Sequence, residues 1–312
     1  MPDPARKSGI RFKYQRFERL PETMRTHRVA GYLFILPALL FFAAFLVYPL
    51  LHTVYLSLTE WAGFDLKKIT FVGFDNFKLI PPDWIFWKAM RNTLYFVLGT
   101  TVFLNLLGLA LALFLNNSAR FTRLVRTLVF IPVLLSPVIV GVMWSRIFDP
   151  FGALNQILES LGLIKTPIFW LGDRRMALLS IIGATVWQWV GYDMILYLTG
   201  LQQIPEELYE AAMIDGANRW HVFRRVTLPL LKGVATMVIL LNLIGGVRIF
   251  DLVYVMTKGG PNHNTEVLAT HLYEVAFWFN KMGYASVIAV IILAISLVFA
   301  YSRNRLMSEE KA

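Results

Sequence analysis

Ionisable side chains interrupt two otherwise apolar stretches of this 312-residue sequence. Asp193 lies within WQWVGYDMILY, and Arg248 and Asp251 lie within NLIGGVRIFDLVYV. A charged side chain at the centre of a membrane helix costs about 2.5–3.5 kcal/mol, so such groups usually face a cavity or a partner charge. This is the chemistry of binding or passing a polar solute. Arg248 and Asp251 could instead lie near a helix end and pair with each other at i, i+3.

Patterns for covalent or metal-dependent catalysis are not apparent in the sequence. It contains no cysteine, which excludes disulfides, thiolate metal ligands and cysteine nucleophiles. Its five histidines are scattered, without the HExxH spacing of a zinc site. We find no Ser/His or paired-Asp arrangement that would suit an enzyme acting inside the membrane. We therefore expect no catalytic residue, no metal site and no cofactor bound by this chain.

The elements that must position the charged groups are membrane helices. Hydrophobic residues make up 57% of the chain and charged residues 16%, against about 45–50% apolar residues in soluble domains. About 20 apolar helical residues cross a bilayer. Six segments qualify, so we predict an all-α integral membrane protein with spans near 30–57, 92–115, 125–147, 177–200, 234–256 and 284–302.

The distribution of basic residues predicts the orientation. Lysine and arginine are more numerous in the N-terminal tail (1–29), the 116–124 link, the 201–233 segment and the C-terminal tail (303–312) than in the loops on the opposite side. By the positive-inside rule, both termini and the 201–233 segment are cytoplasmic. The alternative for the first span is a cleaved signal peptide. We expect a retained membrane helix, because the preceding basic region is nearly thirty residues long and no A-x-A site follows.

The cytoplasmic segment 201–233 is unusually polar for its position between two spans. Its core reads EAAMIDGANRWHVFRRVTLPLL (210–231). We predict two short helices, with Pro205 at the first helical position and a turn at Asp215–Gly216. The second helix carries Trp220 and Phe223 on one side. From the residues alone, this element either lies on anionic lipid as an amphipathic helix or docks a cytoplasmic partner.

The motif EAAMIDGA, followed by Phe223 and LPLL, resembles the EAA loop of binding-protein-dependent ABC importer permeases. FVGFDNF (71–77), RNTLYF (91–96), LQQIPEELYEAA (201–212) and VRIFDLVYVMTKGGPNHNT (247–265) are similar to the maltose-type sugar permease branch. The likeness covers residues 30–302. Gly233 departs from it, because many relatives have proline there, and the large outer domain of some maltose-type members is absent.

The resemblance implies the fold of a type I ABC importer permease, with six transmembrane helices and a cytoplasmic EAA coupling helix. It assigns ATPase coupling to residues that match the motif, namely Glu210, Ala211, Ala212, Asp215, Gly216 and Phe223.

The resemblance also implies partners and a location. These are a second homologous permease in a heterodimer, two ATP-binding cassette ATPase subunits, a soluble or lipid-anchored sugar-binding protein, and membrane lipid, but no nucleic acid. ATP and Mg would be bound by the ATPase subunits, because this chain has no G-x-x-x-x-G-K-[ST] motif. The location would be a bacterial or archaeal cytoplasmic (inner) membrane. The cargo would be a sugar or oligosaccharide, and Arg248 would suit an acidic one.

The middle of the fourth and fifth spans would supply the substrate path. The implied positions are Val190, Gly191, Met194, Asn242, Gly245, Gly246 and Ile249, with Gln188, Tyr192 and Asp193 as neighbouring helpers. Only Asn242 in the first group is an obvious partner for a hydroxyl, so either the helpers or the partner permease must supply the other contacts. The alternative function is an ion-coupled secondary transporter or channel with Asp193 as the ion site, although the EAA segment would then have no role.

Overall fold

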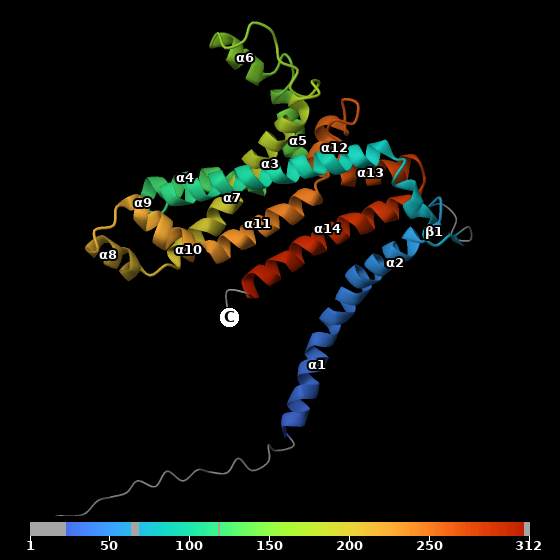
Figure 1. The fold of residues 1–312 in the computed structure, drawn as a ribbon, viewed down its shortest axis with the longest axis horizontal. Helices are drawn as coiled ribbons and strands as arrows, with labels where there is room; N and C mark the ends of the chain where they lie inside the picture. The colour runs from blue at the N-terminus through green and yellow to red at the C-terminus, as the bar shows by residue number, and fades with distance from the viewer. Residues whose placement is uncertain (1–22, 64–68, 118, 309–312) are drawn as a thin grey trace, which may run out of the picture. The chain divides into compact units, whose positions relative to one another are not determined.

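The computed structural model describes residues 23–63, 69–117 and 119–308, and their regular structure is helical apart from one pair of short strands (Figure 1). Most of the basic tail expected over 1–29, and the last four residues of the C-terminal tail, lie outside the described residues. The chain divides into two compact units, residues 1–52 and 53–312.

The first unit is a single apolar helical rod. It consists of α1 (Thr23–Phe42), the π-helical turn η1 (Ala43–Val47) and the first residues of α2 (Tyr48–Ser57). The stretch Leu33–Ser57 is long and apolar enough to cross a membrane. A helix that is apolar on all sides is typical of a membrane span or of the core of a large protein.

The second unit holds the remaining elements. In chain order these are β1 (Thr59–Glu60), β2 (Thr70–Phe71), η3 (Asp75–Leu79), α3 (Trp84–Phe114), α4 (Arg120–Phe130), η4 (Ile131–Leu134), α5 (Pro137–Ile147), α6 (Ala153–Ser160), α7 (Met176–Gln202), α8 (Glu206–Ile214), α9 (Arg219–Val222), η5 (Phe223–Thr227), α10 (Leu228–Leu230), α11 (Lys232–Val247), α12 (Asp251–Thr257), α13 (Leu268–Tyr273), η6 (Glu274–Trp278) and α14 (Met282–Ser308). The strands β1 and β2 pair antiparallel, with Thr59 opposite Phe71.

Helix α7 is the centre of the second unit and packs against α3 and α11. Small residues permit the close approach. A side chain at Gly108 on α3 would collide with Asp193, and one at Gly191 would collide with the Val129 carbonyl on α4. Glycine at such contacts lets membrane helices approach closely without a hydrophobic driving force. Burial of both faces also explains how α7 can carry polar groups such as Gln188, which is fully buried.

The helices at the predicted spans differ in whether they are long and apolar enough to cross a membrane on their own. Leu33–Ser57, Trp84–Phe114 and Met282–Ser302 are each long and apolar enough to cross a membrane. The pairs Arg120–Leu134 with Pro137–Ile147 and Arg219–Leu230 with Lys232–Val247 qualify only when combined, with bends of 100° and 65°. The fourth predicted span corresponds to the 27-residue helix α7, which is not among the described helices that qualify by length and apolar composition. Residues 303–308, expected to belong to the tail, continue α14.

Two of the predicted spans are discontinuous. The third, expected as one helix over 125–147, breaks where Leu135 and Ser136 adopt ψ angles of 140° and 136°. Pro137 explains the break, because a residue before proline is disfavoured in helical geometry. The fifth, expected over 234–256, ends at Val247, and α12 begins anew at Asp251 after Phe250 leaves helical geometry at φ −135°.

Candidate functional site: an intramembrane cavity and an exposed helical hairpin

A cavity of about 480 Å³ lies where α3, α7, α11 and α12 meet. Its wall combines aromatic, hydroxyl and charged groups, which suits a polar ligand with apolar faces. Five residues predicted for the substrate path line it, namely Tyr192, Asn242, Gly245, Gly246 and Ile249. The lining also includes Asp193, Arg248 and Asp251, the ionisable residues that interrupt the apolar stretches.

The polar groups of α7 and α11 are joined across this cavity. The Asn242 side-chain amide donates a 2.6 Å hydrogen bond to Asp193 Oδ2. Asp193 is only 1% exposed, and a buried carboxyl without a partner would be costly. Within the described part of the chain, Arg248 and Asp251 form no ion pair with each other. They flank the break between α11 and α12 and both line the cavity.

Four residues predicted for the path do not line this cavity. Gln188 donates its amide to the Leu135 carbonyl at 3.0 Å, which satisfies a group exposed by the break between η4 and α5. Val190 packs against an apolar cluster. Gly191 lies against α4, and Met194 is fully buried in another apolar cluster. The structure therefore places these four in helix packing.

Residues that the sequence analysis did not name complete the wall. Thr185 and Trp189 on α7, and Thr100 on α3, line the cavity. Thr185, Trp189 and Tyr192 are spaced four and three residues apart, so they share one face of the helix. That periodicity was visible in the sequence and selects this face, whereas the residues predicted on α7, Gln188 and 190–194, lie on several sides of the helix.

The second notable feature is the helical hairpin formed by α8 and α9 at one end of the second unit, away from β1 and α13 (Figure 1). Gly216 has φ +77°. Its N–H bonds to the Met213 carbonyl, and the Ala217 N–H bonds to the Ala212 carbonyl, both at 3.0 Å. This is the Schellman motif that ends a helix at glycine. It stops α8 and fixes the direction in which the chain continues.

A side-chain cap begins the second helix of the hairpin, whereas the first begins after a proline. Asn218 accepts the His221 N–H at 2.9 Å and begins α9. Pro205 precedes the first helical residue of α8 with an extended ψ of 136°, so it lies one position earlier than predicted. The ring of Phe223 packs on Trp220, with centroids 5.7 Å apart.

The hairpin presents an exposed surface. Helix α8 buries no residue. Of the residues predicted to couple to an ATPase, Glu210, Ala211, Asp215 and Gly216 are exposed, and Ala212 and Phe223 are half-buried. Large apolar side chains are exposed beside them, with Ile214 at 86% and Trp220 at 63%. An apolar patch with a charged rim is characteristic of an interaction site.

Apolar helices around a partly polar cavity, with an exposed hairpin at one end, define a membrane-embedded transport subunit. The family model for the inner membrane component of binding-protein-dependent transport systems matches residues 105–307. The chain belongs to this family, as its resemblance to ABC importer permeases predicted. The all-α permease fold is likewise confirmed.

Individual relatives cover nearly the whole chain. The probable ABC transporter permease YurN of Bacillus subtilis is 36% identical over 91% of this chain and 98% of its own length. The lactose transport permease LacF of Rhizobium radiobacter is 35% identical, over 92% and 97%. Among solved structures, a chain of a bacterial alginate ABC transporter, in complex with a periplasmic protein bound to an alginate pentasaccharide, matches with a TM-score of 0.79. Its identity is 23%, covering 91% of this chain and 96% of that one.

Proposed function

We propose that this chain is the membrane-spanning permease subunit of an ABC importer for a sugar or oligosaccharide. The similarity to a lactose permease supports a saccharide cargo. The cavity supports it too, because Trp189, Tyr192 and Phe250 offer ring faces, and Asn242 and Thr100 offer hydrogen-bonding groups. Saccharides present both apolar ring faces and hydroxyl groups, so a wall of this mixed composition matches them.

The observation that carries the proposed mechanism is the exposed hairpin. It is shaped by its own caps, yet it buries no residue of α8. We infer that it docks in a groove of an ATPase subunit. ATP and Mg are then bound by that partner and not by this chain. Closure of two ATPases would draw together the hairpins of two permeases. This movement would change the side of the membrane from which the substrate path can be reached.

The apolar first unit supports an assembly in lipid. Its helix is long and apolar enough to cross a membrane, so it suits contact with lipid or with a second, homologous permease. We propose a heterodimer of permeases in a bacterial or archaeal cytoplasmic membrane, with both termini and the hairpin on the cytoplasmic side. A soluble or lipid-anchored binding protein would deliver the sugar to the opposite face.

Arg248 bears on the charge of the cargo. Among the residues that the structure describes, it is the one cationic side chain in the cavity lining, and Asp193 and Asp251 lie in the same wall. The Asp193 carboxylate is hydrogen-bonded to Asn242 and is not paired with Arg248. The Arg248 guanidinium is therefore available to bind the carboxylate of an acidic sugar. Comparing uptake of a uronate oligosaccharide with that of its neutral counterpart in Arg248→Gln tests this role. A selective loss of uronate uptake is expected if the cargo is acidic.

The test of the proposed function is reconstitution. Affinity capture of this chain from its native membrane should recover an ATPase subunit and a second permease. In vesicles, the captured complex should take up sugar only with ATP and the binding protein present. Uptake driven by a proton or sodium gradient without ATP would instead support an ion-coupled transporter. Asp193 would then be the ion site, because it is buried and lines the cavity.

A further inference from the structure

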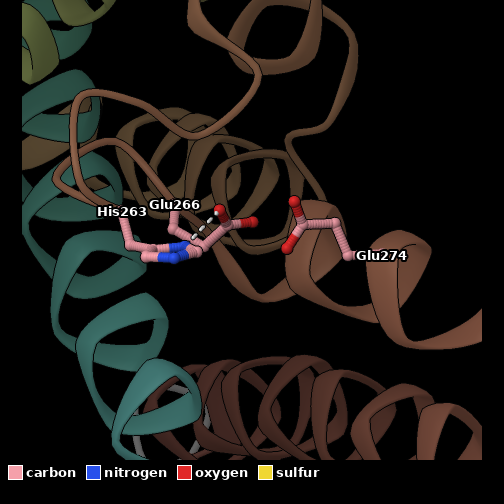
Figure 2. Close-up of side chains that lie close together, drawn as sticks. All are labelled: His263, Glu266 and Glu274. Carbon is pink, nitrogen blue, oxygen red and sulfur yellow. Dashed lines mark hydrogen bonds and ion pairs between the residues drawn. The ribbon is translucent and has the colours of Figure 1, made fainter. Parts of the chain in front are cut away.

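Three potential metal ligands meet in the second unit, outside the cavity. His263 and Glu266 belong to the loop between α12 and α13, and Glu274 begins the π-helical turn η6. One ligand atom from each lies within 4.8 Å of those of the other two. Figure 2 shows the Glu274 carboxylate directed toward that of Glu266, with His263 on the far side of Glu266. The sequence analysis expected no metal site, because these residues are not spaced as in a helical zinc motif.

The distances suit a small cation. His263 Nδ1 and Glu266 Oε2 are 3.2 Å apart. A tetrahedral zinc ion with bonds of about 2.0–2.2 Å separates neighbouring ligand atoms by about 3.3–3.5 Å. This pair is therefore already at the separation of two ligands on one ion, and rotation of the Glu274 side chain would bring in the third.

The charges in the cluster are unbalanced. Glu266 is 1% exposed, and buried charges are normally paired or coordinated to a metal. Among the residues that the structure describes, no lysine or arginine forms an ion pair with Glu266 or Glu274. Two carboxylates therefore face each other with only an imidazole to offset them. A divalent ion would neutralise both.

Neighbouring groups orient these ligands. Thr270 donates its hydroxyl to Glu266 Oε1 at 2.6 Å, which leaves Oε2 facing His263. The His263 ring stands edge-on to Trp84, with centroids 5.5 Å apart. Asn92 donates to the His263 carbonyl at 3.0 Å and holds the loop on α3. Such outer contacts are what fix the ligands of metal sites.

We propose that His263, Glu266 and Glu274 bind one Zn²⁺ ion, with water as the fourth ligand. An imidazole nitrogen with two carboxylates favours a first-row transition metal over Mg²⁺ or Ca²⁺, which prefer all-oxygen sites. The ion would link the α12–α13 loop to η6. Without an ion, the carboxylates of Glu266 and Glu274 place two like charges close together. This inference does not depend on the identity of the transported sugar.

The test measures metal in the assembled transporter, purified through a tag without histidine. After treatment with a chelator and titration with Zn²⁺, the wild-type complex should hold one more tightly bound Zn²⁺ per copy of this chain than His263→Ala. Competition with a chromogenic zinc chelator should show affinity at this site reduced at least about 10-fold in Glu274→Gln, which keeps the shape of the side chain. Glu159→Gln, which neutralises an exposed carboxylate on α6, is the matched control and should bind as wild type.

A measurement on the wild type alone keeps the proposal testable if a variant fails to assemble. X-ray absorption at the zinc edge, recorded with one equivalent of Zn²⁺ per copy of this chain, should show one imidazole ligand and otherwise oxygen ligands. Equal zinc content in wild type and His263→Ala, a spectrum with two or more imidazoles, or displacement of zinc by equimolar Mg²⁺ would overturn the proposal.

Discussion

Asn242 on α11 donates its side-chain amide to Asp193 on α7 at 2.6 Å, and both residues line the same cavity. The sequence identified Asn242 as the obvious partner for a sugar hydroxyl. In the structure one N–H of its amide is bound to Asp193, so its carbonyl oxygen and its second N–H are the groups that remain to bind a hydroxyl. The pair therefore links substrate binding to the packing of two helices.

Replacing Asn242 with alanine should weaken transport. The lost sugar hydrogen bond would cost about 0.5–1.5 kcal/mol, or about 2–13-fold in affinity. Loss of the partner of Asp193 would add a cost in stability, because that carboxyl is buried. Uptake by reconstituted vesicles and thermal unfolding of the complex measure the two effects. Thr236→Ala on the same helix, where the hydroxyl donates to the Lys232 carbonyl of its own helix, is the control. Unchanged uptake in Asn242→Ala would place the substrate contacts on the partner permease.

The sequence was sufficient to predict the all-α fold and the hairpin with its turn at Gly216, because apolar length and turn residues are local signals. The six spans stay a prediction, because three of the described helices qualify by length and apolar composition, or five when each bent pair counts as one span. The sequence did not predict how α7 is oriented. The resemblance pointed to neighbouring positions on α7 without regard to the side of the helix on which they lie. In the structure Gln188 and Met194 pack against other helices, whereas Trp189 lines the cavity. The breaks at Ser136 and Phe250 were also missed, although Pro137 is a local signal for the first of them. At that break a polar group from another helix binds the exposed backbone. Gln188 binds the Leu135 carbonyl.

Asp83 should stabilise the end of the helices opposite the hairpin. It caps α3 by accepting the Ile85 and Phe86 N–H groups, and its other oxygen contacts Tyr284 at 2.7 Å and His271 at 2.9 Å. Asp83→Ala should lower the unfolding temperature of the complex, since loss of a cap alone costs about 0.5–2 kcal/mol. Asp75→Ala, which removes an exposed pair with Lys78, should have little effect.

The stabilisation by Asp83 should depend on pH in a defined direction. Burial by itself would raise the pKa of the Asp83 carboxyl, but hydrogen bonds from Tyr284, Phe86 and His271 outweigh it, and the net pKa is lowered. A lowered folded-state pKa gives stability that is complete above the unfolded value of about 3.9 and lost as pH falls through the folded value. The difference in unfolding temperature between wild type and Asp83→Asn should therefore shrink as the pH falls below about 4. A difference that grows as the pH falls from about 4 to 2 would contradict this assignment.

The proposed topology can be tested with single cysteines, because the chain contains none. Cysteine at Ser308, at the end of α14, should resist a membrane-impermeant thiol reagent in intact cells. Cysteine at Ser160, exposed at the end of α6, should react. Both should react after the membrane is permeabilised. The reverse pattern in intact cells would invert the orientation drawn from the lysine and arginine distribution.

The hairpin should fail at coupling when its turn or its apolar surface is altered. Gly216 has φ +77°, where a β-branched side chain is strongly disfavoured, although no atom lies within 4 Å of the position that its Cβ would occupy. Gly216→Val should therefore act through the backbone and misdirect α9. Gly233→Val is the matched control, because Gly233 has equally open surroundings and no positive φ. Ile214→Asp places a charge at a fully exposed apolar position. It is a cleaner probe than Ala212→Asp, because Ala212 is half-buried.

Stimulation of ATP hydrolysis by sugar-loaded binding protein distinguishes coupling from lipid contact. Gly216→Val and Ile214→Asp should still reach the membrane and pair with the second permease, because neither position packs against the rest of the second unit. They should retain the ATPase weakly in a pull-down and lose most of the stimulation, whereas Gly233→Val should keep both. A hairpin that merely rests on lipid would behave differently, since a charge at Ile214 would then leave ATPase retention unchanged. Wild-type retention and stimulation in both hairpin variants would show that α8 and α9 do not transmit ATP hydrolysis to the cavity.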